Sequence, residues 1–183
     1  MPTILPGARR GLRVAGVRSS VMAFCTACAA PLDTSGRDPV CTGCGRTHFR
    51  DPKVGVGVVV HDEQGRLLLV QRSVGPGKGL WALPAGFVDA DEDPRAAAAR
   101  EAQEETGLEV AVGAVVDVYP VPGRGGASFF LAFEATVVGG TLAAADDALD
   151  AGFFGPDELP ELAFASTLDA ARRSGSQAGT SER

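Results

Sequence analysis

The stretch that decides the fold spans residues 86–108 and reads GFVDADEDPRAAAAREAQEETGL. Acidic residues lead into Pro94, so we expect a helix to begin here, with acids in its first turn and proline near its first position. The alanine-rich segment 96–102 has high helix propensity, and Gly107 can end the helix in a left-handed conformation. One helix is therefore predicted between Pro94 and Gly107.

Three glutamates of this helix, Glu101, Glu104 and Glu105, recur at the spacing i, i+3 and i+4, which places them on one helix face. Like charges at this spacing destabilise an isolated helix by roughly 0.2–0.5 kcal/mol per pair. One interpretation is a solvated acidic face, the usual meaning of a short charge run. The other is a site for a hard divalent cation, because closely set carboxylates repel one another unless a cation lies between them.

The residues around the glutamates decide between these interpretations. From Gly86 onward the sequence follows the pattern G-x5-E-x7-R-E-A-x-E-E-x-G-L, which resembles the Nudix box, G-x5-E-x7-R-E-U-x-E-E-x-G-U, where U is an aliphatic residue. Every fixed position matches, and Ala102 is the smallest acceptable residue at the first U position. The resemblance favours the cation site.

The resemblance also implies roles for the matching residues. The ligands of Mg²⁺ or Mn²⁺ would be the carbonyl of Gly86 and the carboxylates of Glu101, Glu104 and Glu105. Glu92 and Arg100 would brace the box, since an arginine fork can hold carboxylates bidentately and orient them.

Nudix enzymes use either a box glutamate or an acid of a later loop as the base. The later candidates here are Asp146, Asp147 and Asp150, and we favour Asp147 as an accessory ligand or base; an ordinary loop acid is the alternative. The candidate catalytic residues are Glu92, Arg100, Glu101, Glu104, Glu105 and Asp147.

The chemistry that the resemblance implies is hydrolysis of a nucleoside diphosphate linked to another group. Water attacks one phosphorus of the pyrophosphate, while the metal neutralises charge and lowers the pKa of the attacking water. We therefore expect a Mg²⁺-dependent hydrolase with a small nucleotide as its partner.

The expected substrate class is inferred from segments of the chain that resemble particular branches of the family. The chain resembles the zinc-ribbon branch of the family, but residues 117–128, DVYPVPGRGGAS, depart from the NADH pyrophosphatase signature S-Q-P-W-P-F-P-x-S. The segments LPAGF (83–87) and LAFAS (162–166) resemble FAD and ADP-ribose pyrophosphatases, so these substrates, with release of AMP, are expected. Phe87 and Trp81 could stack on a flavin or adenine; core packing is the alternative, above all for Trp81.

Two other functions stay open. One is hydrolysis of NADH or of a nucleotide cap on RNA. The other is a nucleotide sensor or nucleic-acid-binding module without catalysis. The intact box speaks against a sensor, and a net charge of −6 with few basic residues in the ribbon speaks against nucleic acid.

Four cysteines, Cys25, Cys28, Cys41 and Cys44, form two C-x2-C pairs separated by twelve residues. Two such turns can complete a tetrahedral all-cysteine Zn²⁺ site, and a module this short needs the metal in order to fold. A disulfide pairing requires an oxidising compartment, of which the sequence gives no sign. A thioredoxin-like redox pair requires one C-x-x-C beside a βαβ unit. We predict a structural zinc ribbon.

The rest of the chain reads as strands around the central helix. Extended segments are predicted at 54–60, 66–72, 80–89, 108–119, 127–138 and 151–156, and a last helix begins near 168–173. Strands before and after one helix favour a mixed α/β sandwich over a doubly wound parallel sheet. With the family resemblance, the expected fold is a Nudix-type α/β/α sandwich with a mixed sheet, preceded by the ribbon.

The expected organisation is a disordered extension (1–22), the ribbon (23–50), the Nudix domain (51–173) and a disordered tail (174–183). The extension holds four arginines and no acid; a transit peptide or an over-extended start before Met22 are its alternatives. No run of 18 apolar residues occurs, so no membrane span is expected. A cytoplasmic protein, with homodimerisation as one option, is predicted.

Overall fold

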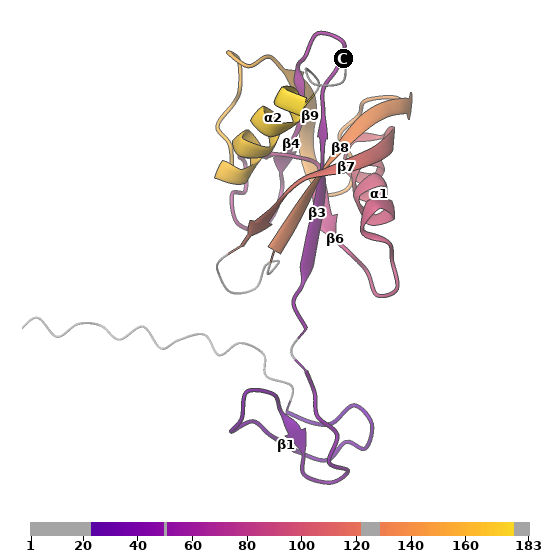
Figure 1. Ribbon diagram of the computed structural model, residues 1–183, viewed down its shortest axis with the longest axis vertical. Helices are drawn as coiled ribbons and strands as arrows, with labels where there is room; N and C mark the ends of the chain where they lie inside the picture. The colour runs from indigo at the N-terminus through magenta and orange to yellow at the C-terminus, as the bar shows by residue number, and fades with distance from the viewer. Residues whose placement is uncertain (1–22, 50, 122–128, 178–183) are drawn as a thin grey trace, which may run out of the picture. The chain divides into compact units, whose positions relative to one another are not determined.

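The computed structural model describes residues 23–49, 51–121 and 129–177. The chain divides into two compact units, Met1–Arg50 and Asp51–Arg183, which are described separately (Figure 1). The expected extension, 1–22, lies outside the described residues, as do residues 178–183 of the expected tail. None of the helices in the described part is long and apolar enough to cross a membrane.

The first unit is built on two equivalent turns around β1 (Leu32–Asp33) and β2 (Val40–Cys41), which pair antiparallel. In each C-x2-C turn the N–H of the first cysteine donates to the carbonyl of the residue five positions later. Cys25 donates to Ala30, and Cys41 donates to Arg46. The residue after each second cysteine is left-handed: Ala29 has φ 59° and Gly45 has φ 72°.

The second unit holds two sheets. The strand order is β6-β3-β8-β7 in one and β5-β4-β9 in the other. β3 runs parallel to β8 and antiparallel to β6, so the larger sheet is mixed, as expected. The strands are β3 (Val54–Val60), β4 (Leu67–Arg72), β5 (Trp81–Ala82), β6 (Ala85–Phe87), β7 (Leu108–Pro120), β8 (Phe129–Gly140) and β9 (Ala148–Phe154).

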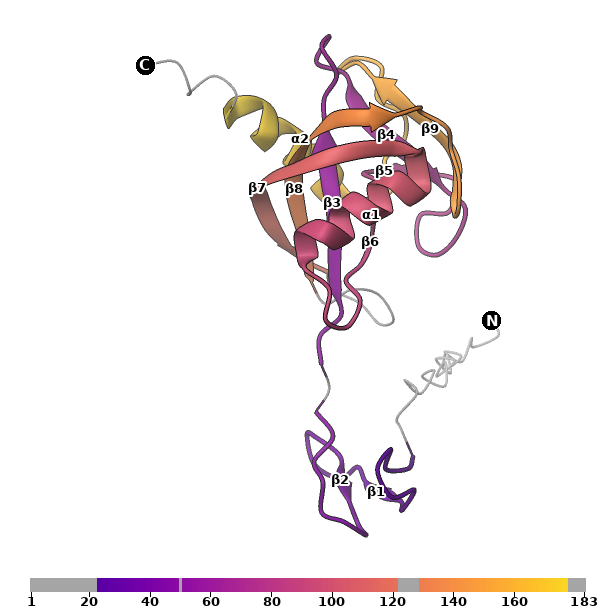
Figure 2. The same cartoon turned by 90° about the vertical axis from the view of Figure 1, so that its right-hand side faces the viewer.

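Helices α1 (Pro94–Thr106) and α2 (Ala165–Gln177) cover opposite sides of the strands (Figures 1 and 2). Side chains alternate across a strand, and β3 therefore serves two cores. Val58 packs in a core with alanines of α1 and with Phe133, whereas Val59 packs in a second core with Ala170 of α2. The near-continuous apolar run of β3 reflects this burial on both faces, and the α/β/α sandwich is confirmed.

Helix α1 begins and ends close to the predicted residues. The Asp93 side chain caps the helix by accepting the N–H groups of Arg95 and Ala96, and Pro94 occupies the first turn. Gly107 closes the helix at φ 70° and donates its N–H to the carbonyl of Gln103. The acids precede the first turn, contrary to our expectation, because Asp93 is the cap itself.

Two segments differ from the sequence prediction. The segment 80–89 is not one strand: β5 pairs with β4, whereas β6 pairs with β3 in the other sheet. Pro84 lies between them, and proline cannot donate to a sheet ladder. Helix α2 continues to Gln177, past residue 174 where we expected the tail to begin. Ala170 and Ser174, which are one turn apart on this helix, are both buried.

Candidate active site and candidate metal centre

Arg100, a residue of helix α1, lies at the centre of an ion-pair network with the acidic residues of the box. The guanidinium donates to both oxygens of Glu92 at 2.9 Å and to the Phe87 carbonyl at 3.1 Å. It also donates to Glu101 at 2.8 Å and to Glu104 at 3.0 Å. The Arg100 hydrogen bonds lower the pKa of Glu92 to about 2, so this brace stays ionised. Arg100 thus fixes Glu92, Glu101 and Glu104 relative to one another.

Glu105 lies deeper than the other two glutamates of the helix. It is 5% exposed, and its Oε2 accepts the N–H of Ala85 at 2.8 Å. Burial raises the pKa of Glu105 to about 8; the Ala85 hydrogen bond opposes this shift, while Asp147 and Glu101 add to it. Burial and neighbouring carboxylates also raise the pKa of Glu101. Burial therefore favours the neutral forms of both carboxyl groups, and a bound cation would favour their charged forms.

Gly86 lies against the helix, directly under Glu101. A Cβ at this position would overlap the Glu101 carboxyl group, so glycine at this position leaves the space that this carboxyl group occupies. The backbone of Gly86 and the Glu101 carboxyl are thereby brought together, as a shared ligand set requires.

Asp147 approaches the box from a distant part of the sequence. It lies in the turn before β9, where its carbonyl accepts the N–H of Ser73 at 3.0 Å. The Asp147 carboxyl group contributes to the raised pKa values of both Glu105 and Glu101, so its side chain lies near these two glutamates. Asp150 lies within β9, and its Oδ1 accepts the N–H of Ala151. Of the three loop acids considered, Asp147 is the one that these contacts place beside the box.

The two aromatic candidates differ in their surroundings. Trp81 makes an edge contact with Phe154, with ring centroids 4.7 Å apart, and packs against the core under α2. Phe87 is 43% exposed, and the Lys53 ammonium lies 4.8 Å from its ring centroid. The structure thus gives Trp81 a packing role and leaves Phe87 accessible to a planar ligand.

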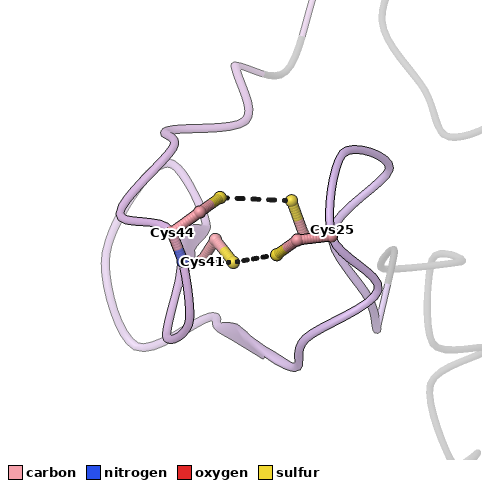
Figure 3. Close-up of side chains that lie close together, drawn as sticks. Cys25, Cys41 and Cys44 are labelled. Atoms are coloured by element: carbon pink, nitrogen blue, oxygen red, sulfur yellow. Dashed lines mark hydrogen bonds between the residues drawn. The ribbon is translucent and has the colours of Figure 1, made fainter.

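The four cysteines of the first unit converge, and Figure 3 labels three of them, Cys25, Cys41 and Cys44. Their Sγ atoms all lie within 4.8 Å of one another; the Cys25–Cys44 distance is 3.8 Å and the Cys28–Cys41 distance 3.4 Å. A tetrahedron with Zn–S bonds of about 2.3 Å has edges of about 3.8 Å, whereas a disulfide requires about 2.05 Å. The cysteines are free and could hold one metal ion.

One residue of this cluster was missed by the sequence analysis. His48 is buried, and its Nε2 lies 3.3 Å from Cys25 Sγ. The Ala27 N–H and, to a smaller extent, His48 lower the pKa of the Cys25 thiol to about 6 against the opposing effect of burial. A histidine four residues after the last cysteine was the available signal.

Comparison with known proteins identifies the class. The NUDIX domain family model matches residues 51–173. The chain belongs to the Nudix family and is a hydrolase acting on phosphorus-containing acid anhydrides.

Individual relatives support this. The ADP-ribose pyrophosphatase of Methanocaldococcus jannaschii is 41% identical over 118 residues, which cover 63% of this chain and 69% of that protein. The NAD-capped RNA hydrolase NudC of Chromobacterium violaceum is 34% identical over 146 residues, 76% of this chain. The chain aligns with 52% of NudC, so it spans about half the length of that relative.

Among solved structures, a NUDIX hydrolase from Nitrosomonas europaea matches with a TM-score of 0.75 and 27% identity. The match covers 87% of this chain and 94% of that one. The similarity therefore extends over most of both chains.

Proposed function

We propose that the protein is a Mg²⁺-dependent pyrophosphatase that hydrolyses ADP-ribose or a closely related nucleoside diphosphate derivative and releases AMP. The observation that carries this proposal is the clustering of carboxylates at the box: Glu101 lies against Gly86, Glu105 accepts the N–H of Ala85, and Arg100 holds Glu104 beside Glu101. Carboxylate and carbonyl oxygens are the ligands that Mg²⁺ prefers. Burial, with neighbouring carboxylates adding to it, raises the pKa values of Glu101 and Glu105, and a bound cation would favour the charged forms of both groups.

In this proposal the metal is held by Glu101, Glu104, Glu105 and the Gly86 carbonyl. When bound, it neutralises the diphosphate and lowers the pKa of the attacking water. The protein's own residues supply position: Arg100 orients Glu101 and Glu104, and Glu92 holds Arg100 in place. Asp147 lies where it can accept the proton of the water or contribute a further ligand.

The reaction consumes one water. Its oxygen forms a bond to one phosphorus, the bridging P–O bond breaks, and the departing phosphate carries away the electron pair. From ADP-ribose the products are AMP and ribose 5-phosphate. The exposed ring of Phe87 next to the box is suited to stack against a planar part of such a substrate.

ADP-ribose leads the proposal because a relative with 41% identity carries that activity in its name. FAD is the other substrate that the sequence resemblance suggests, and it belongs in the same test.

A second candidate is hydrolysis of NAD or of an NAD cap on RNA. It is favoured by the NudC relatives, whose alignments cover 76% of this chain and extend beyond the length of the ADP-ribose pyrophosphatase match. It is disfavoured by the sequence of residues 117–128.

The deciding experiment incubates the purified full-length chain with Mg²⁺ and ADP-ribose, FAD, NADH or NAD-capped RNA, and identifies the products by mass. ADP-ribose cleaved to AMP with the highest kcat/KM supports the proposal. Preferential cleavage of NADH or capped RNA would instead support the second candidate function. If none of the four compounds is cleaved, both candidate functions are refuted. A chelator control should abolish turnover.

We further propose that Cys25, Cys28, Cys41 and Cys44 hold a structural Zn²⁺. The support is the convergence of four free thiols at distances that match a tetrahedral site. Metal analysis of the purified protein, with one Zn²⁺ per chain expected, tests this assignment independently of activity.

A further inference from the structure

His48 is held beside the first cysteine turn by the backbone that follows the second turn. Its N–H donates to the Pro39 carbonyl at 2.8 Å, and the neighbouring Thr47 bridges Val40 antiparallel. The segment after Cys44 therefore folds back along the segment before Cys41. This pairing carries the imidazole across the cluster, where Nε2 lies 3.3 Å from Cys25 Sγ.

The four thiols differ in their access to water. Cys28 and Cys44 are exposed, whereas Cys25 and Cys41 are buried at 3% and 2% exposure. A buried thiolate needs protein hydrogen-bond donors because water cannot solvate it. The negative charge of the two buried thiolates therefore has to be stabilised by hydrogen-bond donors of the protein.

The second turn supplies its buried cysteine with two donors. The N–H groups of Gly43 and Cys44 each lie 3.4 Å from Cys41 Sγ. In the first turn the Ala27 N–H lies 3.4 Å from Cys25 Sγ, and the backbone of Cys28 also acts on this sulfur. His48 Nε2 lies 3.3 Å from the same sulfur, so with Nε2 protonated the ring adds a side-chain donor to those of the turn.

We propose that His48 is a positioning residue of the zinc ribbon, whose Nε2–H donates to the Cys25 thiolate and increases the affinity of the ribbon for Zn²⁺. The inference rests on the proposed zinc site. Four thiolates around one Zn²⁺ leave a net charge of −2. A hydrogen-bond donor to one of the sulfurs stabilises part of this negative charge. Residues that hydrogen-bond to a metal ligand change metal affinity by about 10–100-fold when they are replaced.

The test compares three variants of the full-length, zinc-loaded protein with the wild type. His48→Phe keeps a ring of similar size without a donor. His48→Gln places an amide N–H close to the position of Nε2. His61→Phe is the matched control, because His61 is the other histidine of the chain and belongs to the second unit. Zn²⁺ affinity is measured by competition with a chromogenic chelator.

We expect His48→Phe to weaken Zn²⁺ binding by about 10–100-fold, His48→Gln to restore most of the loss, and His61→Phe to match the wild type. Equal affinity of His48→Phe and the wild type would overturn the proposal. Loss in His48→Gln as large as in His48→Phe would also overturn it, because the ring would then act through packing alone. Failure of the wild type to bind Zn²⁺ would instead refute the zinc site itself.

A spectroscopic measurement separates a donor from a packing role. In the Co²⁺-substituted protein, a thiolate that loses its hydrogen bond becomes a better electron donor, so the sulfur-to-cobalt charge-transfer band should move to longer wavelength in His48→Phe. The band of His48→Gln should stay near that of the wild type. An unmoved band in His48→Phe would contradict the proposal even if Zn²⁺ affinity fell.

Discussion

At the residue scale, the proposed metal ligand Glu105 should couple metal binding to the release of a proton. Its pKa of about 8 in the metal-free protein means that it is largely protonated at pH 7. Because a cation requires the carboxylate, we expect Mg²⁺ binding at pH 7 to release about one proton. Calorimetry in buffers of different ionisation enthalpy measures this release. At pH 9.5 Glu105 is already ionised, so the release should vanish; an equal release at both pH values would contradict the assignment.

The same carboxyl group gives the metal-free protein a pH-dependent stability. The pKa of Glu105 is raised above its ordinary value of 4.5, so the folded state binds the proton more tightly than the unfolded state does. Its contribution to stability is complete below pH 4.5 and is lost as the pH rises through about 8. Urea unfolding in a chelator should show a falling free energy over this range. The fall should be smaller in Glu105→Gln, which cannot ionise.

Glu104 tests the role of charge with little change in packing. Its side chain is 45% exposed and contacts Arg100, so Glu104→Gln should fold with nearly unchanged stability. It should reduce kcat/KM by more than about 100-fold, because it removes a proposed metal ligand and not only an orienting contact. The charge-matched control is Glu158→Gln, at an exposed turn residue. Wild-type turnover in Glu104→Gln would remove this residue from the ligand set.

At the element scale, β3 and β6 approach more closely than side chains usually permit. A Cβ at Gly57 would lie 2.7 Å from the Pro84 carbonyl oxygen, 2.7 Å from the Phe130 ring and 2.9 Å from the Ala85 Cβ. Gly57→Ala should therefore destabilise the protein by about 1–3 kcal/mol through overpacking. Gly113→Ala is the control, since its nearest neighbour would lie at an ordinary 3.5 Å. Urea unfolding compares the two, and equal stability would contradict the packing argument.

The elements also show what local sequence can and cannot predict. Helix α1 was predicted from Pro94 to Gly107 because caps and helix propensity act over a few residues. The division of the segment 80–89 between two sheets was missed, because strand pairing depends on partners distant in sequence. The proximity of Asp147 to Glu105 is non-local in the same way. The family resemblance offered three loop acids as candidates for the base or an accessory ligand. Only the folded structure shows that one of them, Asp147, lies beside the box.

At the scale of the whole molecule, the two units depend on different stabilising forces. The described part of the second unit has two apolar cores, whereas the smaller ribbon brings together four thiols that could hold a metal ion. Removing Zn²⁺ with a chelator should therefore abolish amide protection in residues 23–49 and leave β3 protected. Hydrogen exchange with mass spectrometry measures both. Loss of protection in both units together would contradict this independence.

Homodimerisation and a cytoplasmic location stay predictions, and so does the division of the chain at its two ends. These properties depend on other copies of the chain and on residues outside the described ranges. The family, the enzyme class and the mixed α/β sandwich are confirmed. They were predictable because the Nudix box lies within 23 consecutive residues, 86–108, whose spacing alone carries the resemblance.

The two faces of β3 have a practical consequence for measurement. Val58 and Val59 are adjacent in sequence, yet one belongs to the core beneath α1 and the other to the core beneath α2. Methyl resonances of these two valines would thus report separately on the catalytic side and on the opposite side of the sandwich. A titration with Mg²⁺ followed at both methyl groups would show how far the response to the ion travels through the strand.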